Sequence, residues 1–289
     1  MIRPAVGVIG LGIMGSAMSA NLARSGFKVH GYDVAPAQLD VFRQAGGHPA
    51  RSAAEVAEKA EIVISSLPSA EALHAVASEL TARCIVIETS TLPLEDKNRA
   101  FKTLEAKGIT LLDCPLSGTG AQARTKDLTV YASGDQAAFE QTKPVLEGFS
   151  RAHYYLGEFG NGSKMKYVAN LLVAIHNVAS AEAMVLGMKA GLDPRTIFEM
   201  ISNGAGNSRV FELRAPMMVK NDYSAATMKI KVWDKDMDVI GKYAKALRVP
   251  TPTFAATIPV YAKAEAMGLA MEDTAAVSCS PYPVESAAR

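Results

Sequence analysis

Residues 5–15 read AVGVIGLGIMG, an apolar run that ends in a G-x-G-x-x-G turn. Each glycine has a physical role where a strand leads into a helix. Gly10 permits the tight turn, Gly12 lets a ligand approach the backbone, and Gly15 lets helix and strand pack closely. The free amides at the start of the helix then attract phosphate groups. We therefore predict a dinucleotide-binding turn made of Gly10, Leu11, Gly12, Ile13, Met14 and Gly15.

Asp33 supports this prediction and bears on which dinucleotide binds. It follows a second strand predicted over 28–32, about 20 residues after the turn, where an acidic side chain is expected to bind the ribose hydroxyls of NAD. A carboxylate there repels the 2′-phosphate of NADP, and the first basic residue that follows is Arg43. We expect NAD as the cofactor, with NADP less favoured. The alternative is a glycine-rich turn followed by an ordinary surface aspartate.

The composition excludes several classes of protein. The chain has 289 residues and a formal net charge of +1, without the basic excess of nucleic-acid-binding proteins. Cys84, Cys114 and Cys279 lie far apart, which favours a reducing compartment over a disulfide framework or a cysteine-ligated metal site. The five histidines lack the spacing of metal ligands. No leader precedes the first predicted strand, so we expect a cytoplasmic protein. From the cysteine, histidine and charge patterns we expect no bound metal and no nucleic-acid partner.

The most apolar long stretch, residues 171–192, contains His176, Asn177, Glu182 and Lys189. These polar and charged side chains are costly in lipid. We therefore predict a buried helix rather than a membrane span, and no membrane partner.

The pattern of apolar runs divides the chain into two parts. Up to residue 160, short β-branched runs alternate with helical patterns, and the runs IVI at 62–64 and 85–87 are typical of strands buried on both faces. This alternation predicts an α/β domain over 1–160, a Rossmann-type doubly wound sheet. From 161 to 289 helical patterns dominate, which predicts an all-α C-terminal domain that begins with a long connecting helix over 163–190. The predicted strands are 6–9, 28–32, 61–65, 84–87, 110–113, 128–132 and 153–156.

Two further loops are candidates for the same ligand. Ligands of doubly wound sheets bind beyond the carboxyl ends of the strands. Leu67 and Pro68 follow the predicted strand 61–65, and Ser90 and Thr91 follow the predicted strand 84–87. They are also ordinary turn and capping residues, so their position alone leaves both interpretations open.

Several motifs, in the same order, resemble the β-hydroxyacid dehydrogenase family, part of the 6-phosphogluconate dehydrogenase superfamily. The resemblance covers about residues 7–273. The motifs are GLGIMGSAMSANLARSG (10–26), SLP (66–68), ETSTLP (88–93), DCPLSGTGAQA (113–123), GNGSKMKYVANLL (160–172) and KD (235–236).

The resemblance implies an NAD-dependent oxidoreductase. It would interconvert a small 3-hydroxy acid, such as 3-hydroxyisobutyrate or glycerate, and its semialdehyde or keto acid. The helical domain would serve substrate binding and oligomerisation, as a homodimer or homotetramer. The implied cofactor contacts are Leu67, Pro68, Ser90, Thr91 and Lys235, and the implied substrate contacts are Ser117, Gly118 and Thr119.

Two departures from the family concern the substrate. The family has Ser-Gly-Gly in the substrate segment, where this chain has Ser117-Gly118-Thr119. The family also has two adjacent asparagines after the catalytic lysine, where this chain has Ala169 and Asn170.

The segment 160–172 contains two lysines, and helical geometry separates them. Lys166 and Asn170 are four residues apart and share one helix face, whereas Lys164 points to nearly the opposite side. The family's glycine-to-lysine spacing also selects Lys166. We predict that Lys166 is the general acid/base, with its pKa lowered by burial to about 7–8, and that Asn170 orients the substrate.

The segment 204–218 supplies further candidates and alternatives. Asn207, Arg209 and Arg214 are placed to bind an anionic substrate, or the arginines pair with Glu212 or Glu199 at the surface. The AGNS…F pattern resembles L-threonate dehydrogenases, so L-threonate or a 3-hydroxy amino acid is the alternative substrate. A non-enzymatic alternative is a catalytically silent dinucleotide-binding interaction module.

Overall fold

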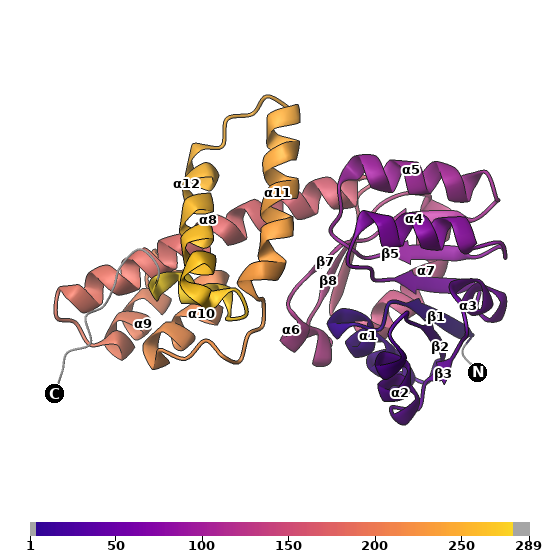
Figure 1. Cartoon of the computed structure of the whole chain (residues 1–289), viewed down its shortest axis with the longest axis horizontal. Coiled ribbons are helices and arrows are strands. Elements are labelled where there is room, and N and C mark those ends of the chain that lie inside the picture. Colours follow the sequence, from indigo (N-terminus) through magenta and orange to yellow (C-terminus); the bar gives the residue numbers. More distant parts are fainter. Residues whose placement is uncertain (1–3, 280–289) are drawn as a thin grey trace. The chain divides into compact units, whose positions relative to one another are not determined.

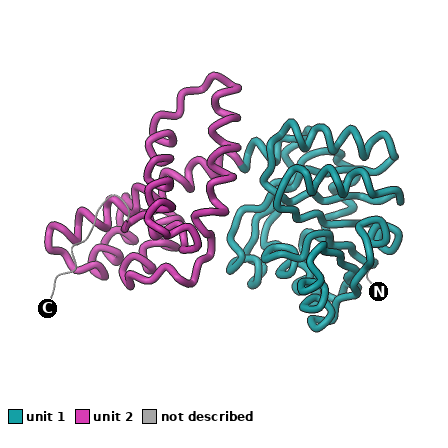
Figure 2. The backbone as a smooth tube through the Cα atoms, viewed as in Figure 1, with its two compact units in different colours: residues 1–166 teal, residues 167–289 magenta. Residues whose placement is uncertain are grey.

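The computed structural model describes residues 4–279 and divides the chain into two compact units, residues 1–166 and 167–289 (Figure 2). Unit 1 is built on a six-stranded parallel sheet with the order β3-β2-β1-β4-β5-β6. Strands β1, β2, β3 and β5 of this sheet are labelled in Figure 1. Because β1 lies between β2 and β4, the chain changes direction across the sheet there, and ligands bind at such switch points. This order confirms the predicted Rossmann-type sheet. Its strands are β1 (Ala5–Ile9), β2 (Lys28–Tyr32), β3 (His48–Pro49), β4 (Ile62–Ser65), β5 (Ile85–Glu88) and β6 (Thr110–Asp113).

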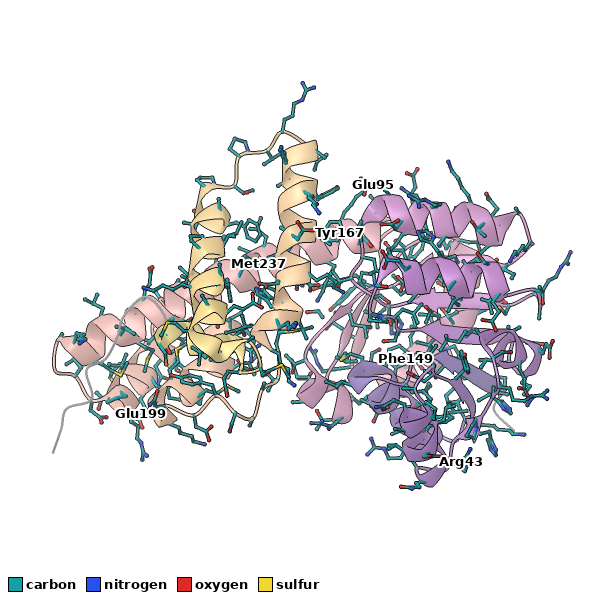
Figure 3. The ribbon with its side chains drawn as sticks, viewed as in Figure 1. Arg43, Glu95, Phe149, Tyr167, Glu199 and Met237 are labelled. Carbon is teal, nitrogen blue, oxygen red and sulfur yellow. The ribbon has the colours of Figure 1, made fainter. Side chains whose placement is uncertain are left out.

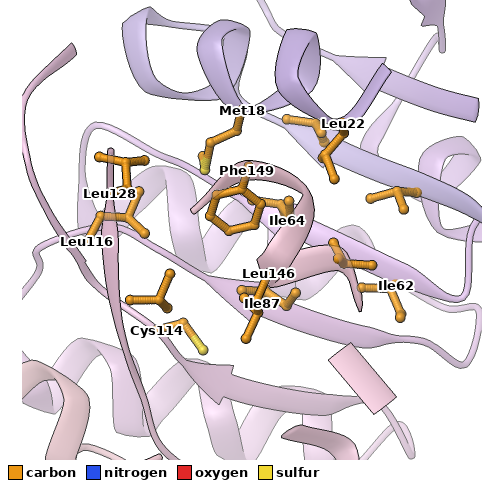
Figure 4. Close-up of a cluster of buried hydrophobic side chains, with 14 of the residues drawn as sticks. Met18, Leu22, Ile62, Ile64, Ile87, Cys114, Leu116, Leu128, Leu146 and Phe149 are labelled. Carbon is orange, nitrogen blue, oxygen red and sulfur yellow. The ribbon is translucent and has the colours of Figure 1, made fainter. Parts of the chain in front are cut away.

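Helices cover both faces of this sheet because side chains alternate along each strand. On one face, Val8 and Ile64 pack against apolar residues of α1 and α7. Figure 4 shows Ile64 in this cluster with Phe149 of α7. On the other face, Ile9 and Val63 pack against residues of α3, α4 and α5. The helices of unit 1 are α1 (Ile13–Arg24), α2 (Pro36–Gln44), α3 (Ala53–Lys59), α4 (Ala70–Glu79), α5 (Leu94–Glu105), α6 (Gly120–Arg124) and α7 (Gln136–Phe149).

A second, three-stranded sheet contains β7 (Leu116–Ser117), β8 (Thr129–Ala132) and β9 (Ala152–Tyr155). The sequence pattern predicts two of these strands but assigns them to one largely parallel sheet. The structure separates them, because β8 pairs antiparallel with the short β7 and parallel with β9. Asp113 and Ser133 join the two sheets through reciprocal backbone hydrogen bonds of 2.9 and 2.8 Å.

Helix α8 (Asn161–Lys189) begins in unit 1 and continues in unit 2, with the boundary between Lys166 and Tyr167. Within residues 4–279 it is the helix that is long and apolar enough to cross a membrane by length and composition. Asn177 in its middle is buried and donates hydrogen bonds of 2.9 Å to the Tyr261 hydroxyl and to the Thr274 carbonyl. Such internal pairing is typical of a helix in a protein core.

After α8, the part of unit 2 that the structure describes is helical. Near the end of this part, Asp273 connects Arg214 and Thr227. The Asp273 carboxylate accepts hydrogen bonds from the Arg214 guanidinium at 3.0 Å and from the Thr227 amide at 2.7 Å. Both charged side chains are buried. The helical elements are α9 (Pro194–Ser202), α10 (Arg209–Lys220), α11 (Ile230–Ala246), α12 (Pro252–Ala264), a π-helical turn (Glu265–Leu269) and a 3₁₀ turn (Thr274–Cys279).

Candidate active site

The glycine turn lies at the carboxyl end of β1 and has the geometry of a phosphate-binding turn. Gly10 has φ +88°, and a Cβ atom there would lie 2.1 Å from the carbonyl oxygen of Ser66. A Cβ atom at Gly15 would lie 1.8 Å from the carbonyl oxygen of Gly10, whereas one at Gly12 would meet no atom within 4 Å. No side chain caps helix α1, and its first turn has no acidic residue. The open space at Gly12 and the uncapped helix start therefore fit a pyrophosphate.

Asp33 is fixed beside this turn. Its Oδ2 accepts a hydrogen bond of 2.7 Å from the Leu11 amide, and its Oδ1 accepts one of 2.8 Å from the Ala35 amide. Each carboxylate oxygen has a further lone pair, so Asp33 can still accept a ribose hydroxyl. Arg43, the first basic residue after Asp33 in the sequence, pairs with Asp40 at 2.6 Å.

The structure brings the two other predicted cofactor loops together. The Leu67 amide donates a hydrogen bond of 2.8 Å to the Ser90 hydroxyl, so the loop after β4 contacts the loop after β5. The Ser66 amide donates to the Ile9 carbonyl at 2.9 Å, which ties the same loop to the end of β1. Pro68 and Thr91 continue these two loops.

The predicted substrate segment also lies against the glycine turn. Ser117 pairs with Thr129 in the small sheet, and Gly118 has φ +134°. The Thr119 amide donates a hydrogen bond of 3.0 Å to the Gln122 side chain at the start of α6. A Cβ atom at Gly120 would lie 2.5 Å from the Cγ2 atom of Ile13. Unit 1 therefore brings the predicted cofactor turn and the predicted substrate segment into contact.

Helix α8 starts in close contact with the ends of β6 and β8. A Cβ atom at Gly162 would lie 2.3 Å from the carbonyl oxygen of Tyr131, so only glycine permits this approach. One turn later, Lys166 is 8% exposed, whereas Lys164 is exposed and donates to Asn161. The burial of Lys166 and not Lys164 agrees with the helical-face argument. Tyr167, the next residue along α8, is labelled in Figure 3.

A buried ionic cluster that the sequence analysis missed lies at the carboxyl ends of β5 and β6. Lys97 Nζ lies 2.6 Å from Glu88 Oε2 and 2.7 Å from Asp113 Oδ1, and all three side chains are fully buried. Burial alone would lower the pKa of Lys97, but the Asp113 and Glu88 carboxylates raise it above its ordinary value. The stabilisation from this raised pKa is present through neutral pH and is lost only as the pH rises through the folded-state value. Glu88 and Asp113 are the last residues of the apolar strands β5 and β6. An acidic residue in that position was the sequence signal that could have revealed the cluster.

In unit 2, the structure brings Asn170 and the KD motif together. Asn170 Nδ2 donates a hydrogen bond of 2.8 Å to Asp236 Oδ2, and both side chains are buried. Lys235 Nζ lies 3.8 Å from Asp236 Oδ1, and its side chain is 40% exposed. Asp236 is the residue of this group that the sequence analysis did not name as part of the site.

Asn207 and Arg209 form a separate local group. Asn207 Nδ2 donates to the Ser202 carbonyl at 3.0 Å and to Glu212 Oε1 at 2.9 Å, and Arg209 pairs with Glu212 at 2.9 Å. This pairing of Arg209 is the one expected of a surface arginine. Arg214 was expected either to bind the substrate or to pair with Glu212 or Glu199 at the surface. It is instead buried and pairs with Asp273.

Comparisons with known proteins agree with this architecture. Residues 5–157 match the family model for the NAD-binding domain of 6-phosphogluconate dehydrogenase, and residues 160–279 match the model described as NAD-binding of NADP-dependent 3-hydroxyisobutyrate dehydrogenase. L-Threonate dehydrogenase of Cupriavidus necator is 34% identical over 94% of this chain and 94% of its own length. 3-Hydroxyisobutyrate dehydrogenase of Pseudomonas aeruginosa is 32% identical over 86% of this chain and 87% of its own length.

A solved structure extends the comparison to three dimensions. The crystal structure of a 3-hydroxyisobutyrate dehydrogenase from Salmonella typhimurium has a TM-score of 0.86 and 30% identity. The alignment covers 96% of this chain and 99% of that one.

The fold, the glycine turn and these matches define a nicotinamide-dependent dehydrogenase that acts on the hydroxyl group of a hydroxy acid. The chain belongs to the β-hydroxyacid dehydrogenase family, as its motifs indicate. The alternative of a catalytically silent interaction module is set aside, because the relatives are dehydrogenases over nearly the whole chain. Their substrates indicate a small anionic substrate for this enzyme as well.

Proposed function

We propose that this enzyme interconverts a small 3-hydroxy acid and its semialdehyde or keto acid with NAD, and that Lys166 exchanges the substrate proton. The observation that carries the proposal is the position of Lys166. It is buried one turn after Gly162, on a helix whose start contacts the ends of β6 and β8. A buried lysine on the catalytic motif of this family is suited to proton exchange with an alcohol.

The proposed chemistry divides between the cofactor and the chain. When bound, the nicotinamide accepts a hydride from the substrate carbon. Neutral Lys166 accepts the hydroxyl proton during oxidation and returns it during reduction. Asn170 orients the substrate; with its amide nitrogen bound to Asp236, its carbonyl oxygen is the available acceptor. The backbone amides of 117–119 hold the carboxylate, and binding at Thr119 requires exchange of its hydrogen bond to Gln122.

The proposed roles extend to the other predicted residues. Gly10 to Gly15, Leu67, Pro68, Ser90, Thr91 and Lys235 contact the cofactor, and Asn207 and Arg209 contribute to substrate recognition. The carboxylate of Asp33 favours NAD over NADP, and the pairing of Arg43 with Asp40 supports this preference.

Substrate identity has two candidates. The first is 3-hydroxyisobutyrate or glycerate, and the second is L-threonate, supported by the similarity to the Cupriavidus necator enzyme. We also propose that the enzyme is a cytoplasmic homodimer or homotetramer. Large apolar side chains that stay exposed in unit 2, Leu186 at 73% and Met200 at 63%, support association of helical surfaces.

A substrate panel combined with Lys166→Ala tests the proposal. 3-Hydroxyisobutyrate, glycerate, L-threonate and L-serine are each incubated with NAD, and NADH absorbance is followed. With the best acid, Lys166→Ala should lower kcat by at least about 10²-fold, because proton exchange loses its catalyst, while NAD affinity changes little. Lys164→Ala, on the exposed side of the same helix, is the matched control and should retain activity. Full turnover in Lys166→Ala would contradict the assignment.

A further inference from the structure

We propose that Lys97 is a positioning residue that holds the loop 88–91 and the first turn of α8 in place through Glu88 and Asp113. The inference rests on the proposed role of Lys166, because the first turn of α8 leads to that lysine. Every residue in the argument lies in unit 1.

The cluster is built to fix geometry. One ammonium group lies within 2.7 Å of two carboxylates, and none of the three side chains reaches solvent. Removing three charged groups from water is costly, so such a cluster adds little net stability compared with well-packed apolar side chains. The removal of one member, in contrast, leaves an uncompensated buried charge. The position of Lys97 therefore determines where both carboxylates lie.

Glu88 connects the cluster to the cofactor loops. Its Oε1 accepts a hydrogen bond of 2.9 Å from the Ser90 amide, while its Oε2 faces Lys97. The Ser90 hydroxyl in turn accepts the hydrogen bond from the Leu67 amide. One carboxylate thus links Lys97 to both predicted cofactor loops.

Asp113 connects the cluster to the catalytic helix. Its Oδ2 accepts a hydrogen bond of 2.7 Å from the Ser163 amide, and its Oδ1 accepts one of 2.8 Å from the Ser163 hydroxyl. The neighbouring Gly162 amide donates to the Ser133 hydroxyl at 2.9 Å. A carboxylate at a helix N-terminus is also attracted by the helix dipole. Asp113 therefore fixes the start of the helix that carries Lys166.

The loss of Lys97 should displace both the loop 88–91 and the first turn of α8. Without the ammonium, Glu88 and Asp113 repel each other, and the loop and the helix start shift apart. A misplacement of about 1 Å at a reacting group can lower a rate by about 10²-fold. The effect should therefore appear in turnover and in cofactor binding, although Lys97 touches neither ligand.

The test compares Lys97→Met with Lys107→Met. Lys107 is the matched control, because it also lies in unit 1 and donates three hydrogen bonds, to the carbonyls of Ala77, Ser78 and Leu80, far from the catalytic helix in sequence. In the protein without cofactor, amide hydrogen exchange of residues 161–166 and 88–91 should be faster in Lys97→Met and unchanged in Lys107→Met. With NAD and the best acid of the panel, kcat should fall at least about tenfold in Lys97→Met, and the Kd for NAD should rise, while Lys107→Met retains both. Equal exchange and kinetics in the two variants would overturn the proposal.

Ser163→Ala keeps the test decisive if Lys97→Met does not fold. It removes only the hydroxyl contact with Asp113 and retains the amide contact. It should speed exchange over 161–166 and lower kcat about threefold or more, with NAD affinity unchanged. Wild-type exchange and kcat in this variant would refute the positioning role. If Lys166→Ala keeps its turnover, the proposed function fails, whereas a loss of turnover there with wild-type behaviour in Lys97→Met refutes the present inference alone.

Discussion

The carboxylate of Asp33 has a structural role in the glycine turn, and we propose a second role for it in cofactor binding. Each oxygen accepts one backbone hydrogen bond, from Leu11 within the glycine turn and from Ala35 beyond β2, and these bonds hold the turn against the end of the strand. The remaining lone pairs are those that a ribose needs. The same side chain therefore shapes the turn, and we propose that it also favours NAD over NADP.

Asp33→Asn should weaken the preference for NAD. The amide has one acceptor oxygen and places an NH2 group against a backbone donor, so one hydrogen bond and the negative charge are lost. We expect kcat/KM with NAD to fall about tenfold or more, and kcat/KM with NADP to fall less, because repulsion of the 2′-phosphate is removed. Steady-state kinetics with both cofactors measure the ratio. Asp40→Asn, an exposed aspartate that pairs with Arg43, is the control; an unaltered ratio in Asp33→Asn would argue against selection by this residue.

Single residues also show what sequence patterns miss. The positions of Asp33 and Gly12 at the glycine turn were predictable because they depend on local spacing around one turn, whereas their roles stay predictions. Lys97 was not, because a lysine on a helix is ordinarily solvated. Its burial depends on Glu88 and Asp113, which come from two different strands and meet only in the folded sheet.

At the scale of elements, we expect Gly15 and Gly12 at the start of α1 to have different roles. A Cβ atom at Gly15 would collide with the Gly10 carbonyl, whereas one at Gly12 would enter open space. Gly15→Ala should therefore destabilise the fold by about 1–3 kcal/mol, as overpacking does. Gly12→Ala should leave stability within about 0.5 kcal/mol, because its backbone angles suit alanine, and should raise the Kd for NAD about tenfold or more.

Denaturant unfolding without cofactor and calorimetric titration with NAD measure these two effects. Gly15→Ala and Gly12→Ala serve as controls for each other. The interpretation fails if Gly12→Ala binds NAD as the wild type does, or if Gly15→Ala is as stable as the wild type.

The short strands were missed by sequence reasoning for a physical reason. Strands β3 and β7 have two residues each, too few for a periodic pattern. Strands β1, β4 and β5 of the parallel sheet were predictable because their isoleucine and valine residues are buried on both faces.

At the scale of the whole molecule, the proposed assembly determines the mass in solution. We expect a mass of two or four times 30.6 kDa, because unit 2 exposes large apolar side chains on α8 and α9. Size-exclusion chromatography with light scattering measures it. The double variant Leu186→Glu/Met200→Glu should have a smaller mass, and Val34→Glu, in unit 1 and 86% exposed, should not. A wild-type monomer would contradict the proposed assembly.

The contact between Ile13 and Gly120 has a consequence for redesign of the enzyme. Any side chain at position 120 would press on Ile13 in the cofactor turn, and Asn21 of α1 also holds α6 through the Ala123 carbonyl at 2.7 Å. The turn and the substrate segment therefore cannot be exchanged as independent modules. A library that changes cofactor use by replacing residues 11–13 should vary position 120 and its neighbours at the same time, since each segment sets the shape of the other.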